Sequence, residues 1–529
     1  MSWRLNILLA AMGLALGFAV AQFQPFPGYL DSDYYFGGGV QLARGRGFME
    51  PYLWNYIDDP EGLPHPSHTY WMPLASLIAA SGMVISGQTT YPAGRAGFLV
   101  LAAAVPVVTA ALAYTISRQR GSALVSGLLA VFSIYYVPFL PVPDNYGVYL
   151  VLGALFFLCM SWSHPGAALI MGALAATMTL ARSDGVLWLV LAIIAASASS
   201  RRGGSSSGVA PIPEDGGAER PRAMRAPALR IVLVAGGFLL IMAPWLMHNW
   251  SVHGSFFAPG GERLIWLTAY EDTFLYPANQ LTYERWISQG LPSILTARLA
   301  ALRWNLLNAF AAQGGIFLFP FIVIGVWTRR RDARIRVGLL GWSALLVAMT
   351  LVFPFAGARG GFFHAGAGFQ SLWWTLAPLG LESAVGAARR RGMFTPQAST
   401  VFRAALVGIA VLMSALIIGI RLLPGWGEGE EQYPRIEAFL VEAGARPGEI
   451  VMVRNPPGYN VLTERPAIVV PYAGAEGMLA AANRYGARYL VIERAGAAGP
   501  IQGVYDNQYT SAFEYLGELD GTRIFRISR

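Results

Sequence analysis

Two carboxylic acids separated by a single residue, Asp31 and Asp33, follow the first apolar segment of the chain. A carboxylate at a membrane surface can act as a general base that accepts the proton of an attacking hydroxyl group. The ordinary alternative is a solvated turn at a helix start, with Asp31 as the N-cap residue. In a helix, residues two apart point about 200° apart, so one site could receive only one of the two carboxylates. In an extended segment both would lie on the same face.

Five further polar residues stand next to apolar segments. Asp144 lies in the turn Pro141-Val142-Pro143-Asp144-Asn145, either in a site or as an ordinary turn residue. Arg182 and Asp184 separate two short apolar segments, where charges are costly and indicate either a functional site or a mutual ion pair. Arg359 and His364 flank a Gly-Gly-Phe-Phe run. An arginine there could bind phosphate oxygens or serve as an interfacial anchor.

A third group of candidates lies between the acidic pair and the second long apolar segment. His65 opens a run that continues through Tyr70 and Trp71 to Pro73 and Leu74. His65, with Asp31 and Asp33, forms a loose set that could bind a divalent metal. Arg95, at the start of the next apolar segment, could bind substrate or pair with the acids of this loop.

The composition is that of a polytopic membrane protein. Of 529 residues, 55% are hydrophobic and only 13% are charged, about half the charged fraction of soluble domains. Every basic residue is arginine, so lysine-based Schiff-base and P-loop chemistry are excluded. The single cysteine excludes intramolecular disulfides and cysteine-based zinc sites. The net charge of +8 is explained by arginine-rich cytoplasmic loops, and no nucleic-acid partner is implied.

About eleven apolar segments are long enough to cross a membrane, and the arginines between them place the N-terminus in the cytoplasm. The short apolar stretch Trp71–Ser86 is predicted as a non-spanning helix at the interface, because counting it as a span would invert the arginine pattern. The first segment is interpreted as a retained span, although Ala19-Val20-Ala21 resembles a signal-peptide cleavage site. The predicted spans are 5–23, 95–116, 121–141, 146–162, 167–181, 185–200, 229–249, 304–327, 335–356, 369–388 and 401–422.

The sequence predicts two domains. Residues 1–423 form the membrane domain, with a large external loop at 24–94 and a Gly/Ser/Pro/Arg-rich, disordered cytoplasmic linker at 201–228. Residues 424–529 change to a soluble pattern in which helices alternate with strands, which favours a small α/β domain outside the cytoplasm. The strands are expected at 449–453, 467–470, 488–493 and 522–527, and the helices at 433–443 and 475–485.

The order of motifs in the first loop resembles that of the GT-C glycosyltransferases, which use lipid-phosphate sugars and include protein O-mannosyltransferases and the aminoarabinose transferase of lipid A. These enzymes have an acidic pair after the first helix, then a Gly-rich helical segment and a His/Lys-Pro-Pro-Leu-type motif. The matching elements here are Asp31-Ser32-Asp33, His65-Pro66 and Tyr70-Trp71-Met72-Pro73-Leu74. Most closely, the chain resembles bacterial proteins with mannosyltransferase-type or lipopolysaccharide-core galacturonosyltransferase-type domains. It departs from the pattern in having Asp-Ser-Asp for Asp-Glu and His-Pro-Ser-His for the double proline.

The resemblance implies a GT-C-like fold and transfer of a sugar from a polyprenyl-phosphate donor to a glycan, lipid or protein acceptor, with inversion, on the outer face of the cell membrane. It implies that Asp31 is the base and that Asp33 supports it, while an arginine or a divalent metal binds the departing phosphate. The expected substrate-binding residues are Asp144, Arg182, Asp184, Arg359, His364, Arg95, His65, Tyr70 and Trp71.

Two other functions are compatible with many spans. A flippase or transporter of lipid-linked saccharides would show internal repeats of spans, which we do not detect. A scaffold that presents the C-terminal domain would leave the acids of the first loop without a role.

Overall fold

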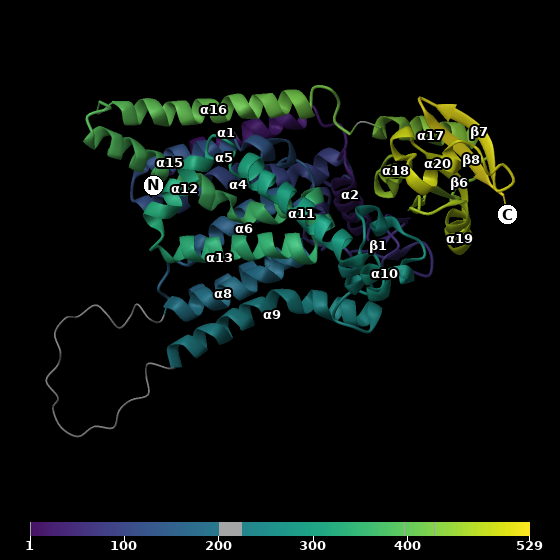
Figure 1. Ribbon diagram of the computed structural model, residues 1–529, viewed down its shortest axis with the longest axis horizontal. Coiled ribbons are helices and arrows are strands. Elements are labelled where there is room, and N and C mark those ends of the chain that lie inside the picture. Colours follow the sequence, from purple (N-terminus) through teal and green to yellow (C-terminus); the bar gives the residue numbers. More distant parts are fainter. Residues whose placement is uncertain (1, 200–224, 396, 428, 529) are drawn as a thin grey trace, which may run out of the picture.

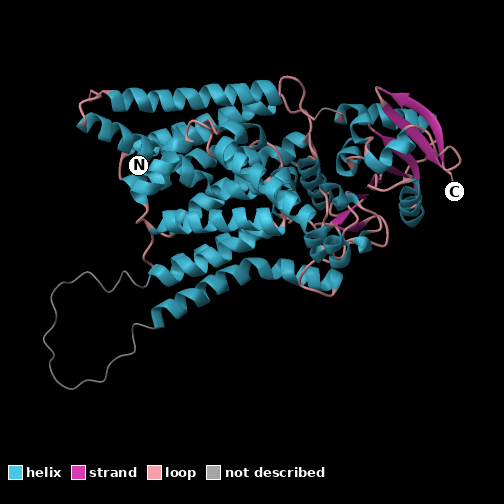
Figure 2. Cartoon of the chain, in the orientation of Figure 1, coloured by secondary structure: helices cyan, strands magenta, loops and turns pink. Residues whose placement is uncertain are grey.

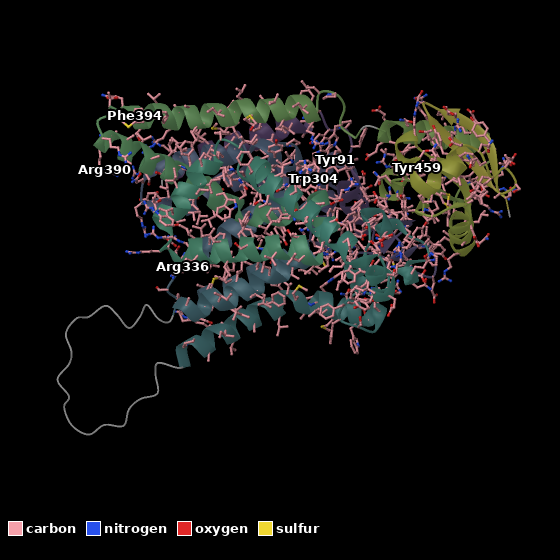
Figure 3. All side chains as sticks on the ribbon, viewed as in Figure 1. Tyr91, Trp304, Arg336, Arg390, Phe394 and Tyr459 are labelled. Atoms are coloured by element: carbon pink, nitrogen blue, oxygen red, sulfur yellow. The ribbon has the colours of Figure 1, made fainter. Side chains whose placement is uncertain are left out.

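The structure, a computed structural model, describes residues 2–199, 225–395, 397–427 and 429–528. The chain forms a bundle of long helices with a smaller α/β unit at one end, and the N-terminus lies at the opposite end (Figure 1). Arg336 and Arg390 lie at the end far from the α/β unit, whereas Tyr91 lies at the near end (Figure 3). The arginine-rich loops and the α/β unit therefore occupy opposite ends of the bundle.

Five helices within the described residues are long and apolar enough to cross a membrane: Trp3–Ala21, Tyr91–Ser117, Pro227–His253, Ala333–Val352 and Ala398–Arg421. The other apolar helices are shorter, so the count of eleven spans remains a prediction. The bundle consists of α1 (Trp3–Ala21), α4 (Tyr91–Ser117), α5 (Arg120–Val131), α6 (Asn145–Cys159), α7 (Gly166–Ala181), α8 (Val186–Ser199), α9 (Arg225–His253), α11 (Gly290–Asn308), α12 (Phe319–Arg329), α13 (Ala333–Val347), α15 (Phe362–Arg390) and α16 (Ala398–Arg421).

The predicted spans 121–141 and 304–327 are interrupted helices. The segment predicted at 121–141 ends its helix at Val131 and continues as a 3₁₀ helix, Ile134–Phe139, which contains Pro138. The segment predicted at 304–327 passes from α11 through a π-helical turn and two glycines before α12 begins. Proline and glycine explain these breaks, because neither is favourable in the middle of a helix. Most of the predicted linker 201–228 lies outside the described residues.

The first external loop packs between the bundle and the α/β unit. It contains α2 (Leu30–Ala43), β1 (Met49–Glu50), β2 (Tyr52–Leu53), β3 (His65–Pro66) and α3 (Leu74–Ser86). α3 coincides with the predicted interfacial helix and begins directly after Pro73. With 13 residues it is about 20 Å long, which is shorter than the hydrocarbon core of a bilayer.

The C-terminal unit is a six-stranded sheet covered by helices (Figure 2). Its strand order is β2-β5-β4-β6-β8-β7, with the first four strands parallel and the last two antiparallel to their neighbours. Five of these strands come from the C-terminal unit, whereas β2 comes from the first external loop and pairs with β5. The C-terminal elements are α17 (Tyr433–Glu442), β4 (Ile450–Val453), α18 (Pro456–Thr463), β5 (Ala467–Val469), α19 (Ala475–Tyr485), β6 (Ala487–Ile492), α20 (Gln502–Tyr505), β7 (Phe513–Leu519) and β8 (Thr522–Ile527).

Candidate active site

The acidic pair lies in the first turn of α2, where the helix dipole favours negative charge. Because the segment is helical, the two carboxylates point to different sides. Asp31 lies beside His364 of α15, in the bundle. Asp33 is fully buried and accepts a hydrogen bond of 2.8 Å from Asn455 of the C-terminal unit. The two acids therefore belong to different surroundings.

An imidazole ring connects Asp31 with Asp144. His364 Nε2 lies 3.8 Å from Asp31 Oδ2, and its Nδ1 lies 3.7 Å from Asp144 Oδ1. The ring of Tyr146 stacks on the imidazole with a centroid distance of 4.0 Å, which fixes its orientation. Three residues from distant parts of the sequence thus meet at one place on the end of the bundle.

Asp144 and Asp31 differ in how much of their hydrogen-bonding capacity is used. Asp144 caps α6 by accepting from the Asn145 backbone N–H, and it also accepts from the Tyr29 hydroxyl, both at 2.5 Å. In the described part of the chain, Asp31 makes no hydrogen bond to another side chain, and its side chain is 28% exposed. Asp31 is therefore the carboxylate that is free to contact a substrate.

Burial shifts the protonation of both carboxyl groups. It raises the pKa of Asp31 to about 7, and the nearby charge of Asp144 adds to the shift. It also raises the pKa of Asp144, to about 6. The positive charge of Arg182 acts in the opposite direction on both groups. A carboxylate with a pKa near the working pH is well suited to accept a proton.

Arg182 and Asp184 form an ion pair beside this group. The Arg182 guanidinium donates two hydrogen bonds to Asp184 Oδ2, at 2.7 and 3.1 Å. The Tyr149 hydroxyl also donates to Asp184, at 3.0 Å. This is the mutual pair that the sequence left open as an alternative to a binding role.

Arg359 is exposed and lies beside Tyr270 and Glu271. It belongs to a π-helical turn, Gly357–Gly361, and its side chain is 60% exposed. The guanidinium lies 4.7 Å from the ring centroid of Tyr270 and 3.5 Å from a Glu271 carboxylate oxygen. Burial and then the charge of Asp31 raise the pKa of Tyr270, so this tyrosine lies near the acid as well as the exposed arginine.

Aromatic rings line the side of the site next to Asp31. Trp71 stacks on Trp54 with a centroid distance of 4.0 Å and an interplanar angle of 10°. Tyr70 meets both rings edge-on, at 4.8 and 5.6 Å. Burial, followed by Tyr270 and Asp31, raises the pKa of Tyr70, which places Tyr70 near the acid. Aromatic faces of this kind can stack on a sugar ring.

Two candidate residues lie elsewhere and have local partners. His65 is buried, with Nε2 at 3.1 Å from the Tyr52 carbonyl oxygen and 3.2 Å from a Glu50 carboxylate oxygen. Arg95 donates to the backbone carbonyls of Ala21, the last residue of α1, and of Gln24. The structure does not bring Asp31, Asp33 and His65 together, and no group of three metal-ligating side chains occurs among the residues it describes.

Sequence reasoning missed several residues of the site. Tyr29, Tyr146 and Tyr270 contact or face its acids, and Trp54 supports Trp71. Tyr29 could have been suspected from its position two residues before Asp31. The other three gave no signal, because tyrosine and tryptophan are common throughout the apolar segments.

No protein-family model matches the sequence, and no curated protein matches it. Solved structures do match the fold. The Archaeoglobus fulgidus oligosaccharyltransferase in complex with Zn and sulfate superposes with a TM-score of 0.61 at 11% identity, over 98% of this chain and 72% of that chain. The same archaeal enzyme, AglB, with an inhibitory peptide and a dolichol-phosphate gives a TM-score of 0.60 at 11% identity, covering 100% of this chain and 75% of that one. ArnT from Cupriavidus metallidurans bound to undecaprenyl phosphate gives 0.58 at 11% identity, covering 99% and 98%.

The chain has the GT-C fold. The resemblance seen in the first loop is thus confirmed at the level of the fold, over the length of the chain. At this identity the comparisons do not assign the roles of individual residues, which depend on the geometry described above.

Proposed function

We propose that the protein is an integral-membrane glycosyltransferase that moves a sugar from a polyprenyl-phosphate donor to a cell-envelope acceptor. The observation that carries the proposal is the Asp31 carboxylate, which is partly exposed, has no hydrogen-bonded side-chain partner in the described part of the chain, and lies 3.8 Å from His364. A general base requires a carboxylate of this kind that is open to the substrate.

In the proposed reaction, the acceptor hydroxyl group donates its proton to Asp31 while its oxygen attacks the anomeric carbon. The bond between that carbon and the phosphate oxygen breaks, and the electron pair leaves with the polyprenyl phosphate. A single displacement inverts the anomeric centre. His364 lies between the carboxylates of Asp31 and Asp144 and keeps the two acids in position. The aromatic side chains of Tyr70 and Trp71 pack against the sugar.

Arginine supplies positive charge for the departing phosphate. Arg359 is the first candidate, because it is exposed and its pairing with Glu271, at 3.5 Å, is loose. Arg182 is the second candidate, and it would have to share its guanidinium between Asp184 and the phosphate. A planar guanidinium matches phosphate oxygens through two parallel hydrogen bonds. No step is assigned to a divalent metal.

We further propose a multi-pass arrangement in the cell membrane, with the N-terminus in the cytoplasm and residues 424–529 outside. The support is that the arginine-rich loops and the α/β unit lie at opposite ends of the bundle (Figures 1 and 3). The site lies at the end that carries the α/β unit, where a lipid-linked donor and an envelope glycan, lipid or protein could meet.

The test is donor consumption by the purified protein in lipid nanodiscs. Synthetic undecaprenyl-phosphate hexoses are supplied together with a solubilised envelope fraction, and free undecaprenyl phosphate is measured by mass spectrometry. This readout does not require the acceptor to be known. Transport of intact donor across a vesicle membrane without any cleavage would indicate a flippase instead and would overturn the proposal.

A further inference from the structure

Asp33 meets two polar residues of the C-terminal unit in a buried cluster. The Asn455 amide nitrogen donates to Asp33 Oδ2 at 2.8 Å and to Glu430 Oε1 at 3.2 Å. Asp33 is 0% exposed and Glu430 is 6% exposed. Each of the two carboxyl groups also has one oxygen with no hydrogen-bond partner, Asp33 Oδ1 and Glu430 Oε2.

The orientation of the Asn455 amide is fixed by its own role as a helix cap. Its oxygen accepts from the Gly458 backbone N–H at 3.1 Å at the start of α18. The NH₂ group must therefore face the two acids, and both of its hydrogens are used there. A side chain at Gly458 would place its Cβ 3.0 Å from Asp33 Oδ2, so a glycine permits the close approach of α18 to α2.

The carboxyl groups of Asp33 and Glu430 lie next to each other, because both approach the same Asn455 amide nitrogen, at 2.8 and 3.2 Å. Two ionised carboxylates repel at this range, so one of them must carry a proton when the units are docked. Burial raises the pKa of Asp33 to about 7 and raises that of Glu430 as well. The backbone N–H of Gly28 partly opposes both shifts.

The surroundings supply no close cation for this pair among the described residues. The nearby Arg454 is paired with Glu493, at 3.5 Å, and Glu493 also accepts a hydrogen bond from the Tyr433 hydroxyl at 3.0 Å. Arg95 is occupied with the backbone carbonyls of Ala21 and Gln24. The titratable or charged side chains that face the pair or its immediate partners are Asp31, Tyr52, Tyr91, Arg95, Tyr433, Arg454 and Glu493.

We propose that Asp33 is a positioning residue: it shares one proton with Glu430, and the pair, bridged by Asn455, docks the C-terminal unit on the first turn of α2. This inference rests on the proposed function in one respect, because docking holds in place the turn that carries Asp31. Trp426 assists by donating to the carbonyls of Phe26 and Pro27, immediately before that turn.

Docking of this kind depends on pH in a defined window. Separated carboxyl groups titrate near pH 4, whereas Asp33 in the docked state titrates at about 7. The docked state therefore holds one more proton between these values. Docking is therefore strongest below about pH 4 and weakens as the pH rises toward about 7, because the docked state keeps a proton that the separated groups lose.

Hydrogen exchange followed by mass spectrometry tests this in the full-length protein in nanodiscs. The opening equilibrium of α18 is obtained from pH 5 to pH 8 after correction for intrinsic exchange rates. We expect wild-type opening to increase by about tenfold per pH unit below about pH 7. Glu430→Gln keeps the shape, supplies a permanent donor to the ionised Asp33, and should weaken the pH dependence clearly, although the burial of Asp33 remains.

The matched control is Glu464→Gln, at the end of the same helix. Glu464 is 74% exposed and pairs with Arg44 across the same interface at 2.8 Å. It should keep the wild-type pH dependence. Equal pH dependence in wild type and Glu430→Gln, or its loss in Glu464→Gln as well, overturns the proposal.

A transfer assay with Asp33→Asn distinguishes a positioning role from a catalytic one. The introduced amide can donate to an ionised Glu430, so docking should persist, transfer should stay within about tenfold of wild type, and its pH dependence should change. A loss of 100-fold or more with unchanged α18 exchange would make Asp33 the base and overturn the positioning role. If no variant or wild type consumes any donor while the exchange results hold, the proposed function fails and the docking pair stands.

Discussion

Replacing Asp31 by asparagine removes the proposed proton acceptor and leaves the shape of the site unchanged. In the described part of the chain, the Asp31 side chain has no hydrogen-bonded side-chain partner that would be lost. The change also relieves the repulsion between Asp31 and Asp144, which the raised pKa of Asp31 reflects. The remaining structural loss is the favourable position of a negative charge at the start of α2, which is worth about 0.3–1 kcal/mol.

The expected catalytic loss is much larger than this structural effect. A general base contributes about 10²- to 10⁴-fold in rate, which corresponds to roughly 2.7–5.4 kcal/mol of barrier height. Transfer by Asp31→Asn should therefore fall by about 100-fold or more, while the thermal midpoint of unfolding hardly changes. A turn residue without catalytic function would give nearly normal transfer.

The assay is release of free undecaprenyl phosphate, measured with saturating donor. The matched control is Asp520→Asn, which removes the same charge from an exposed surface ion pair with Arg435 in the C-terminal unit. The control should keep wild-type transfer. If Asp31→Asn also keeps full transfer while folded, the assignment of the base is wrong and so is the mechanism built on it.

Four further outcomes are expected. Transfer by the wild type should rise with pH through about pH 7, because burial raises the pKa of Asp31 to about 7 and only the ionised carboxylate accepts a proton; a flat profile from pH 5 to 8 would contradict this. Arg359→Ala should weaken donor binding by about 10- to 100-fold without unfolding the protein, since its partner Glu271 is loosely held; unchanged affinity in a donor titration would shift the assignment to Arg182. Trp426→Phe should lower the stability of docking by about 1–3 kcal/mol, measured as increased exchange in α18, because two carbonyl groups lose their donor. A reporter fused to the C-terminus should be active only in a form that works outside the cytoplasm, and cytoplasmic activity would indicate that α3 is an additional span.

Local patterns predicted local structure well. The helix expected at 475–485 and the strand expected at 522–527 have the bounds of α19 and β8. The short apolar stretch after Pro73 is a separate helix of 13 residues. The argument that a helical acidic pair could offer only one carboxylate to a site also agrees with the structure, in which Asp31 and Asp33 have different partners. Each of these features depends on residues only a few positions apart.

Features that depend on distant residues were not predictable from the same patterns. β2 has only two residues, and it becomes a strand because β5, some four hundred positions later, offers a parallel edge. α18 begins with two prolines and was not among the predicted elements, but Asn455 caps it. His364, Asp144 and Asp31 were each singled out separately, and only the fold shows that the imidazole lies between the two acids.

Long-range contacts also join the two domains that the sequence divides at residue 424. The composition does change there, and the chain after it has the pattern of a soluble domain. In the packed structure, however, the sheet of this unit takes its edge strand from the first external loop, and its residues Glu430 and Asn455 surround the buried carboxyl group of Asp33. Since a buried carboxylate without partners is costly, the membrane part and the C-terminal unit depend on each other at this point. The turn of α2 that carries Asp31 lies within that shared interface, so the C-terminal unit belongs to the structure that positions the proposed base.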